Sequence, residues 1–267
     1  MVSDMAHSWD IITMTIKDVT QSIITPKLKV LSGGLSNSRT SDRLLYLLQV
    51  VNSAFPTGAF NHSYGFETLI DSGEIHDVHS FEKICKDWIR YSVVPGDAAA
   101  VAHAHRAILA NDTAALISLD HMVAAIKLSV EVREASAKTG AAMASTVWEV
   151  FAPVSFEGYL NAIKNKECEG HHAVTFGAAA AAMKVSMFDA VLAFIQAALT
   201  NLASVASRLI PLGQVDTQRV IHGAWDNLEE LVSKACDTPI DSIGTTTIGL
   251  DIASMHHERL YSRLCMS

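Results

Sequence analysis

From Ser41 to the C-terminus, the chain shows one helix signal after another and no sustained alternation of apolar and polar residues. Capping residues open several segments, and turns rich in Pro and Gly separate them. The expected helices cover residues 43–51, 81–91, 97–110, 114–127, 129–150, 155–165, 172–184, 187–209 and 215–236, with breaks at Phe55–Gly58, Val94–Asp97, Ala152-Pro153 and Ile210–Gly213. We therefore predict an all-α fold, a single-domain helical bundle of roughly eight to ten helices over residues 41–267.

The composition supports closely packed helices. Apolar residues make up 49% of the chain but aromatic residues only 7%, because alanine carries much of the apolar fraction. Alanine has the highest helix propensity, and its small side chain lets helices approach one another. Before residue 41 such signals are missing, and the Gly- and Ser-rich stretch Leu31–Ser38 is typical of a linker. Residues 1–40 are expected to form a poorly organised N-terminal extension.

Charge and cysteine usage exclude several protein classes. A formal charge of −8 argues against a nucleic-acid-binding protein, which would carry a basic patch. Four scattered cysteines without a CxxC pair fit a reducing compartment, and the first ten residues lack the order of a signal peptide. The most apolar segment, residues 187–210, is interrupted by polar side chains, which indicates a buried helix rather than a membrane span. We expect a cytoplasmic protein that binds neither nucleic acid nor membranes.

The common catalytic and nucleotide-binding motifs are missing from the sequence. The patterns GxxxxGK[ST], GxGxxG, HExxH and GxSxG do not occur. Although this does not exclude an enzyme, no motif argues for one.

The twelve histidines include four close pairs, which raises the alternative of a metal-binding protein. Residues one or two apart on a helix point to different faces, so only the pair His76/His79 has a spacing that suits chelation within one segment. The pairs are His76/His79, His103/His105, His171/His172 and His256/His257. Histidines in interfaces or in contact with solvent are the favoured interpretation, and a nickel-type site stays the alternative.

Three further segments are unusual for a helical protein. Gly58–Glu67 brackets a polar-aromatic run with two glycines, which suits a sharp turn between helices. Glu131–Gly140 places Arg133, Ser136 and Gly140 on one helical face, where small residues permit close approach of another helix or chain. Asp251–Ser267 joins a helix-like stripe to a dense cluster of polar side chains, as expected of a docking element or of a surface helix that closes the fold.

Taken together, these segments resemble the urease accessory protein F (UreF) family. The resemblance runs from about residue 43 to the end and depends on four blocks in the family's order, with a weaker match at His171-His172 and Phe176-Gly177. The blocks are Phe55–Glu67, Glu131–Gly140, Ser207–Gln214 with Gln218-Arg219, and Asp251–Ser267.

The resemblance implies a function without catalysis. Members of this family are all-α homodimers that bind the accessory protein of the D or H type and the nickel-carrying GTPase of the G type. The assembly delivers nickel to apo-urease, and the F protein bridges its partners and modulates the GTPase. The resemblance implies no resident cofactor and leaves open whether nickel passes through the complex in contact with this chain. The alternative function is a direct nickel carrier that uses the paired histidines.

By correspondence with the family, the C-terminal block engages the D-type partner, and the loop before residue 214 serves the dimer or the complex. The partner-binding residues so implied are Tyr261, Ser262, Arg263 and Leu264 with His256 and Glu258 in support; Arg208, Pro211, Leu212, Gly213 and Gln214; Arg133 and Ser136 on a face near that loop; and His62, Ser63 and Tyr64. Cys265 stands where the family usually has Phe. A pocket built for Phe would lose about 1–2 kcal/mol with Cys, at ~25 cal/mol per Å².

Overall fold

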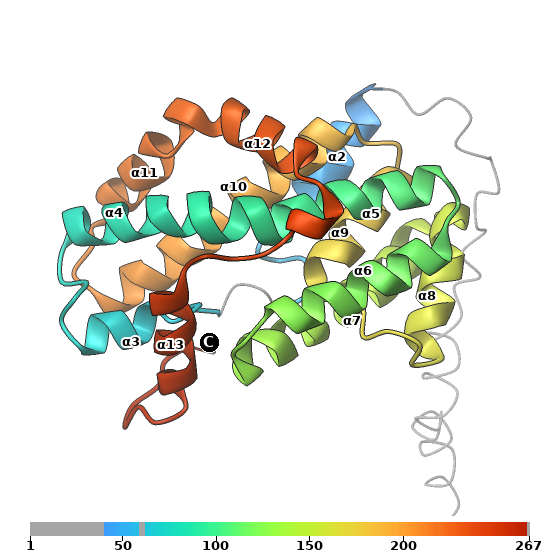
Figure 1. Ribbon diagram of the computed structural model, residues 1–267. Helices are drawn as coiled ribbons and strands as arrows, with labels where there is room; N and C mark the ends of the chain where they lie inside the picture. The colour runs from blue at the N-terminus through green and yellow to red at the C-terminus, as the bar shows by residue number, and fades with distance from the viewer. Residues whose placement is uncertain (1–39, 59–61, 266–267) are drawn as a thin grey trace, which may run out of the picture. The chain divides into compact units, whose positions relative to one another are not determined.

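The structure, a computed structural model, describes residues 40–58 and 62–265, which form helices joined by short turns, with no β-strand among them (Figure 1). The predicted all-α bundle is confirmed. The extension expected before residue 41 lies outside the described residues, except for Thr40. The helices are α2 (Thr40–Val50), α3 (Phe66–Asp71), α4 (Val78–Trp88), η2 (Ile89–Ala98), α5 (Ala99–Leu109), α6 (Thr113–Ile126), α7 (Val130–Phe151), η3 (Val154–Phe156), α8 (Glu157–Lys164), α9 (His172–Ala182), α10 (Met187–Leu209), α11 (Gln214–Gly223), η4 (Trp225–Asn227), α12 (Leu228–Asp237), η5 (Ile240–Ser242) and α13 (Ile248–His257).

The central helix is α9, which packs against α5, α7 and α10 (Figure 1). Every residue from Ala173 to Ala182 is buried. Because most of these side chains are alanines, the neighbouring backbones come close. At Gly177, a Cβ atom would collide with the carbonyl oxygen of Val101 on α5. The sequence predicted that alanine would let the helices pack closely, and the alanines of α9 do so at the centre of the bundle.

The small-residue face predicted on α7 packs against the same chain. A Cβ atom at Gly140 would overlap the backbone of Gly170 and His171, which lead into α9. The Ser136 hydroxyl accepts a hydrogen bond from the backbone N–H of His172, at 3.3 Å. Asp120 holds the other side of this turn, where its carboxylate accepts three backbone N–H groups and the Tyr159 hydroxyl. The start of α9 is thereby fixed by α6 and α7.

The break expected at Val94–Asp97 is not there. The chain runs on from α4 through a π-helical segment, η2, into α5. Pro95 lacks the N–H that a regular α-helix needs, and a wider helical turn lets the helix continue past it. Two carbonyl groups of this segment bond outside the helix: Pro95 accepts the N–H of Gly244 at 3.1 Å, and Tyr91 accepts that of Thr246 at 3.0 Å. The π-helical segment therefore positions the residues that lead into α13.

Two other helix boundaries differ from the prediction. The helix expected from residue 81 begins earlier, at Val78, because Asp77 caps it: the Asp77 carboxylate accepts the N–H of Ser80 in a capping box. The single helix expected over residues 215–236 is divided into α11 and α12 by the turn after Gly223. In that turn the indole N–H of Trp225 donates to the Gln196 side chain on α10, at 2.9 Å. A tertiary contact thus fixes the break.

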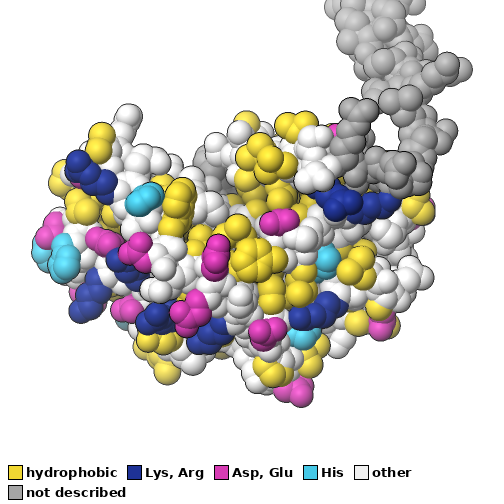
Figure 2. Space-filling view, turned by 90° about the horizontal axis from the view of Figure 1, so that it is seen from above, with side chains coloured by type: hydrophobic (Ala, Val, Ile, Leu, Met, Phe, Trp, Pro, Cys, Tyr) yellow, Lys and Arg dark blue, Asp and Glu magenta, His cyan; other side chains and the backbone are white. Residues whose placement is uncertain are grey.

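Helix α10 is long and apolar enough to cross a membrane by length and composition, but half of its most apolar window is buried inside the protein. It contacts α5, α9, α11 and α12. The interpretation as a core helix fits these contacts. On the face seen from above, side chains of both charges are interspersed among apolar ones, with no extended basic area over its described residues (Figure 2).

The close approach of α5 and α9 predicts the effect of adding one methyl group. Gly177→Ala should lower the free energy of unfolding by about 1–3 kcal/mol, because the Val101 carbonyl leaves no room for a Cβ atom. Gly249→Ala is the control, because Gly249 lies on α13 with open space around it. This substitution should raise the free energy of unfolding by about 0.5–1 kcal/mol. Urea unfolding followed by circular dichroism measures both. Equal effects of the two substitutions would contradict the tight α5–α9 contact.

Candidate partner interface and central cavity

Helix α13 turns its apolar stripe outward. Its buried residues are Leu250, Ala253, Ser254 and His257, at helical spacing. Of the apolar stripe noted in the sequence, Ile252 and Met255 are 47% and 41% exposed, and Ile248 is 68% exposed. The sequence left open whether this stripe faces the body or a partner, and in the structure it faces outward. A polar contact network at His257, and not apolar burial alone, determines which side of the helix faces inward.

Residues 62–67, the described end of the motif 55–67, form the seat of α13. Gly65 has φ +86°, which a glycine adopts without strain, and it begins α3. A Cβ atom at Gly65 would lie 2.7 Å from the Leu250 carbonyl oxygen and 2.9 Å from the Ser254 nitrogen. The backbone of α13 therefore rests directly on the backbone of Gly65. The predicted turn therefore packs against the C-terminal helix, and Figure 1 shows α3 and α13 side by side.

Glu67 binds the end of the chain. Its buried carboxylate accepts the backbone N–H groups of Leu264, at 2.6 Å, and Cys265, at 3.0 Å, and contacts Nε2 of His257 at 2.9 Å. Hydrogen bonds to a charged acceptor are stronger than those between neutral groups. We call residues 258–265 the tail. Glu67 fastens the tail and the last turn of α13 to α3.

Glu131 on α7 completes the network. It contacts Nδ1 of His257 at 2.7 Å and Arg263 at 3.0 Å. His257 is buried between two carboxylates, and both of its ring nitrogens can donate only when the ring is protonated. Each ring nitrogen of His257 lies beside one carboxylate oxygen, Nε2 beside Glu67 and Nδ1 beside Glu131. One histidine of the His256/His257 pair thus serves to seat the tail, and the other is exposed.

The structure exposes most tail side chains predicted to contact a partner. Tyr261 is fully exposed and Leu264 is 64% exposed, and the side chains of His256, Glu258 and Ser262 also face solvent. Arg263 is half-exposed beside Glu131. Cys265 is buried, and burial raises the pKa of its thiol. The tail therefore lies on the body of the protein through its backbone, Arg263 and Cys265, and presents its other side chains outward.

The predicted interface loop connects α10 to α11. Arg208, Pro211, Gly213 and Gln214 are exposed, whereas Leu212 is buried in the core. Arg208 lies near the tail, since its charge acts on the Cys265 thiol. Gly213 caps α11, so this loop is a surface turn anchored by one apolar side chain. Its role as a partner contact stays a prediction.

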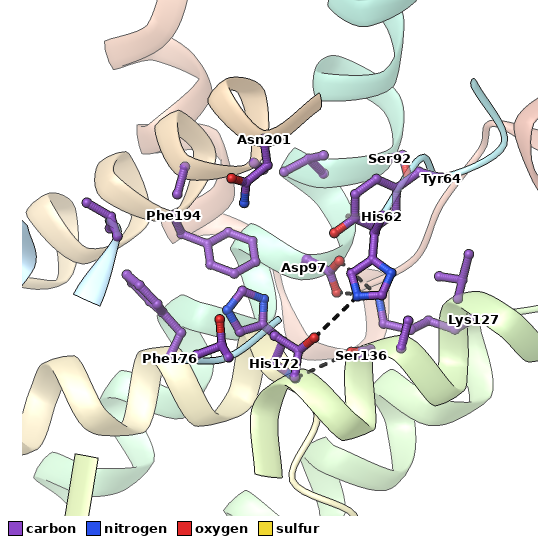
Figure 3. Close-up of a pocket in the computed structure, with 18 of the residues that line it drawn as sticks. His62, Tyr64, Ser92, Asp97, Lys127, Ser136, His172, Phe176, Phe194 and Asn201 are labelled. Atoms are coloured by element: carbon purple, nitrogen blue, oxygen red, sulfur yellow. Dashed lines mark hydrogen bonds and ion pairs between the residues drawn. The ribbon is translucent and has the colours of Figure 1, made fainter. Parts of the chain in front are cut away.

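A cavity of about 100 Å³ is lined in part by His62 and Tyr64 (Figure 3). Its wall includes side chains from the motif, η2, α7, α9, α10 and the segment around α13. The polar groups that line it include His62, Tyr64, Asp97, Lys127, Ser136, His172, Asn201, Thr245 and Asp251. Sequence analysis singled out His62, Tyr64 and Ser136 but as partner contacts. His62 and Ser63 are buried, and their role as partner contacts stays a prediction.

Burial dominates the electrostatics of this cavity. Lys127 and Asp97 form an ion pair at 2.8 Å, with the lysine side chain only 9% exposed. Burial lowers the pKa of both His62 and His172 to about 4, with a smaller contribution from Lys138 at His62. Both rings are therefore neutral near pH 7. Burial also raises the pKa of Asp251 and, together with Asp97, that of Tyr64. Only the paired ions and Asp251 bring charge into a cavity otherwise lined by neutral groups.

The histidine pairs are split between different surroundings. His103 bonds to the carbonyl of Thr238, and His105 to that of Val185, each at 2.8 Å. His171 is fully buried, next to Asp120, whereas His172 lines the cavity between aromatic rings. Among the residues that the structure describes, no three His, Cys, Asp or Glu side chains are grouped so that they could hold a metal ion. The two rings of the His103/His105 pair, and those of the His171/His172 pair, therefore lie in different surroundings.

Comparison with known proteins identifies the family to which this chain belongs. A family model described as UreF matches residues 75–224 of this chain. The urease accessory protein UreF of Bacillus sp. (strain TB-90) is 37% identical over 227 residues, which cover 85% of this chain and 100% of that protein. The chain belongs to the UreF family. The UreF proteins of Corynebacterium glutamicum (strain R) and Actinobacillus pleuropneumoniae serotype 3 (strain JL03) are 35% and 30% identical, over 83% of this chain and 96% and 97% of theirs.

Membership confirms the resemblance and makes this chain a urease accessory protein, which acts in urease maturation. The family model ends at residue 224, but the similarity to whole relatives extends over most of the chain. The surface formed by α13 and the tail is what the structure adds. Its exposed apolar residues Ile248, Ile252 and Met255 were not among the predicted partner contacts. If His257 is taken as buried, the helical spacing of α13 places these three residues on the opposite, exposed face.

The neutral cavity histidines predict a loss of stability in acid. A histidine whose pKa is about 4 in the folded state and about 6.5 in the unfolded state stabilises the fold above pH 6.5. That contribution should be lost as the pH falls from about 6.5 to about 4. His172→Gln should flatten the dependence of the unfolding free energy on pH in this window, as measured by urea unfolding. His76→Gln, at an exposed position, is the control and should leave the slope unchanged.

Neutralising Glu67 should release the tail. Glu67→Gln keeps the shape of the side chain but weakens its bonds to two backbone N–H groups and to His257. The buried Cys265 thiol should then react with a thiol reagent at least about ten times faster, by the equivalence of 1.4 kcal/mol to a factor of ten. Glu134→Gln, on the exposed face of α7, is the matched control. An unchanged rate in Glu67→Gln would show that apolar contacts alone hold the tail.

Proposed function

We propose that this chain is a non-enzymatic scaffold of urease maturation, which bridges the D- or H-type accessory protein and the nickel-carrying GTPase so that nickel reaches apo-urease. In this proposal it works in the cytoplasm as a homodimer and modulates the GTPase. Family membership supports the setting, since its relatives carry the name urease accessory protein. The lack of a nucleotide-binding motif in the sequence is consistent with leaving GTP chemistry to a partner.

The observation that carries the proposal is the outer surface of α13 and the tail. Exposed apolar side chains lie together on one helical face and continue into the tail, where Tyr261 is fully exposed. Exposed apolar patches rimmed by polar groups mark interaction sites, and tyrosine is enriched among the residues that dominate binding energy. The surface consists of Ile248, Ile252, Met255, Tyr261 and Leu264, with His256, Glu258, Arg259 and Arg263 among the polar residues of the same segment. We assign this surface to the D- or H-type partner.

Light scattering on size-exclusion peaks tests the scaffold role. The chain, its cognate D-type protein and the nickel GTPase should form one complex when mixed. Met255→Glu and Tyr261→Ala should each weaken binding of the D-type protein by about ten-fold or more, because they put a charge into the interface or remove an aromatic anchor. Ile240→Glu, at an exposed apolar position on η5, is the control and should bind normally.

Two outcomes would contradict the proposal. If folded partners form no complex with the unmodified chain, the scaffold role is wrong. If a complex forms equally well with Met255→Glu, Tyr261→Ala and the control, the scaffold role stands but the docking surface lies elsewhere. Circular dichroism of each variant confirms that the helical fold is kept.

We further propose that the chain holds no resident cofactor and that nickel crosses the complex without a stable site here. The divided surroundings of the histidine pairs support this, since two rings already bond to backbone carbonyls. Isothermal titration with Ni²⁺ distinguishes this from the carrier alternative. Tight stoichiometric binding by the isolated chain, lost on replacement of paired histidines, would favour the carrier.

A further inference from the structure

The seat of α13 and the central cavity share their walls. His62 and Tyr64 line the cavity, and Gly65 and Glu67 in the same motif hold α13 and the tail. On α7, Ser136 lines the cavity, whereas Glu131, little more than one turn earlier, binds His257. The seat of α13 and the central cavity are thus built from opposite sides of the same short segments.

Helix α13 is itself part of the cavity wall. Asp251 in its first turn and Thr245 just before it both line the cavity, and the Thr245 hydroxyl lies 3.5 Å from the Asp251 carboxylate. These residues are held from behind by the π-helical segment, where the carbonyls of Tyr91 and Pro95 accept N–H groups of the same stretch. Asp97 in that segment also faces the cavity (Figure 3). One side of the cavity therefore consists of residues that precede and begin the docking helix.

Helix α13 is attached through polar contacts at its far end and through a few buried side chains, among them Leu250 and Ala253. The contacts that hold the far end of α13 are those of Glu67 and Glu131 to His257 and the tail, and the middle rests on Gly65. Segments with exposed faces and few buried contacts open at lower free-energy cost than a packed core. By contrast, α9, which forms the opposite wall with His172 and Phe176, is almost entirely buried. Four of the ten residues of α13 are buried, against ten of the eleven residues of α9.

We propose that α13 is a movable wall of the central cavity, and that a partner docked on its outer face holds it closed over His62 and His172. The inner and outer faces of α13 are opposite one another, so a partner can cover Ile252 and Met255 while Gly65 and Glu67 keep their contacts. Binding outside then stabilises the closed cavity inside. The second half of this inference rests on the proposed docking function; the first half does not.

Modification of histidines with diethyl pyrocarbonate, located by peptide mass spectrometry, tests the proposal on the full chain. Gly65→Ala should unseat α13, and labelling at His62 and His172 should rise about five-fold or more. Gly73→Ala is the matched control, since Gly73 also has positive φ, +80°, but no atom lies within 4 Å of a Cβ there. Buried His105 should stay protected in both variants, and exposed His76 should react throughout.

Glu67→Gln provides a second variant in case Gly65→Ala does not fold, and Cys265 reactivity reports whether its tail has come free. A reactive Cys265 with His62 and His172 still protected would overturn the proposal, as would labelling that rises equally at His105. Adding the D-type protein to the unmodified chain should slow labelling at His62 and His172. A complex that leaves these labelling rates unchanged would overturn the claim that a partner holds α13 closed. A failure to form that complex contradicts only the proposed function, because the variants test the wall without a partner.

Discussion

The contact between α5 and α9 leaves no room for a side chain at Gly177, and the rest of the structure is arranged around that approach. Close packing of alanine-rich backbones makes α9 a rigid centre, buried over almost its whole length. α7 reaches it through a second glycine, Gly140, and the Asp120 carboxylate fixes the turn that starts it. A core made of such small side chains depends on backbone fit more than on large apolar groups.

Irregular geometry then connects this core to the functional surface. The helix that contains Pro95 continues as a π-helical turn, and the carbonyls of Tyr91 and Pro95 bind the residues before α13. The motif with Gly65 and Glu67 receives α13 from the other side. A proline and a glycine, which usually interrupt helices, here position one. The surface assigned to the partner is thus carried by contacts that reach back to the core helix α5.

Much of this could be predicted from the sequence where local chemistry decides. Helices such as α10 end close to where their capping residues and prolines indicated, because those effects act within a few residues. The π-helical continuation past Pro95 could not be predicted, because its carbonyl groups bond to N–H groups of Gly244 and Thr246, which are distant in the sequence. The direction in which the stripe on α13 faces could not be predicted for a similar reason. Its spacing fits a docking face as well as a buried one, and the two carboxylates that contact His257 lie on α3 and α7.

The sequence by itself determined the helical class, the alanine-rich interior and the family, because composition, capping and conserved-looking blocks are properties of short segments read in order. Only the tertiary structure decided which face of α13 is buried, and that Glu67 ends up bonded to the backbone of Leu264 and Cys265. It also decided that His62 lines a cavity and does not lie on the surface. The physical reason is that a buried charge finds its partners in space, at sequence separations that no local pattern encodes.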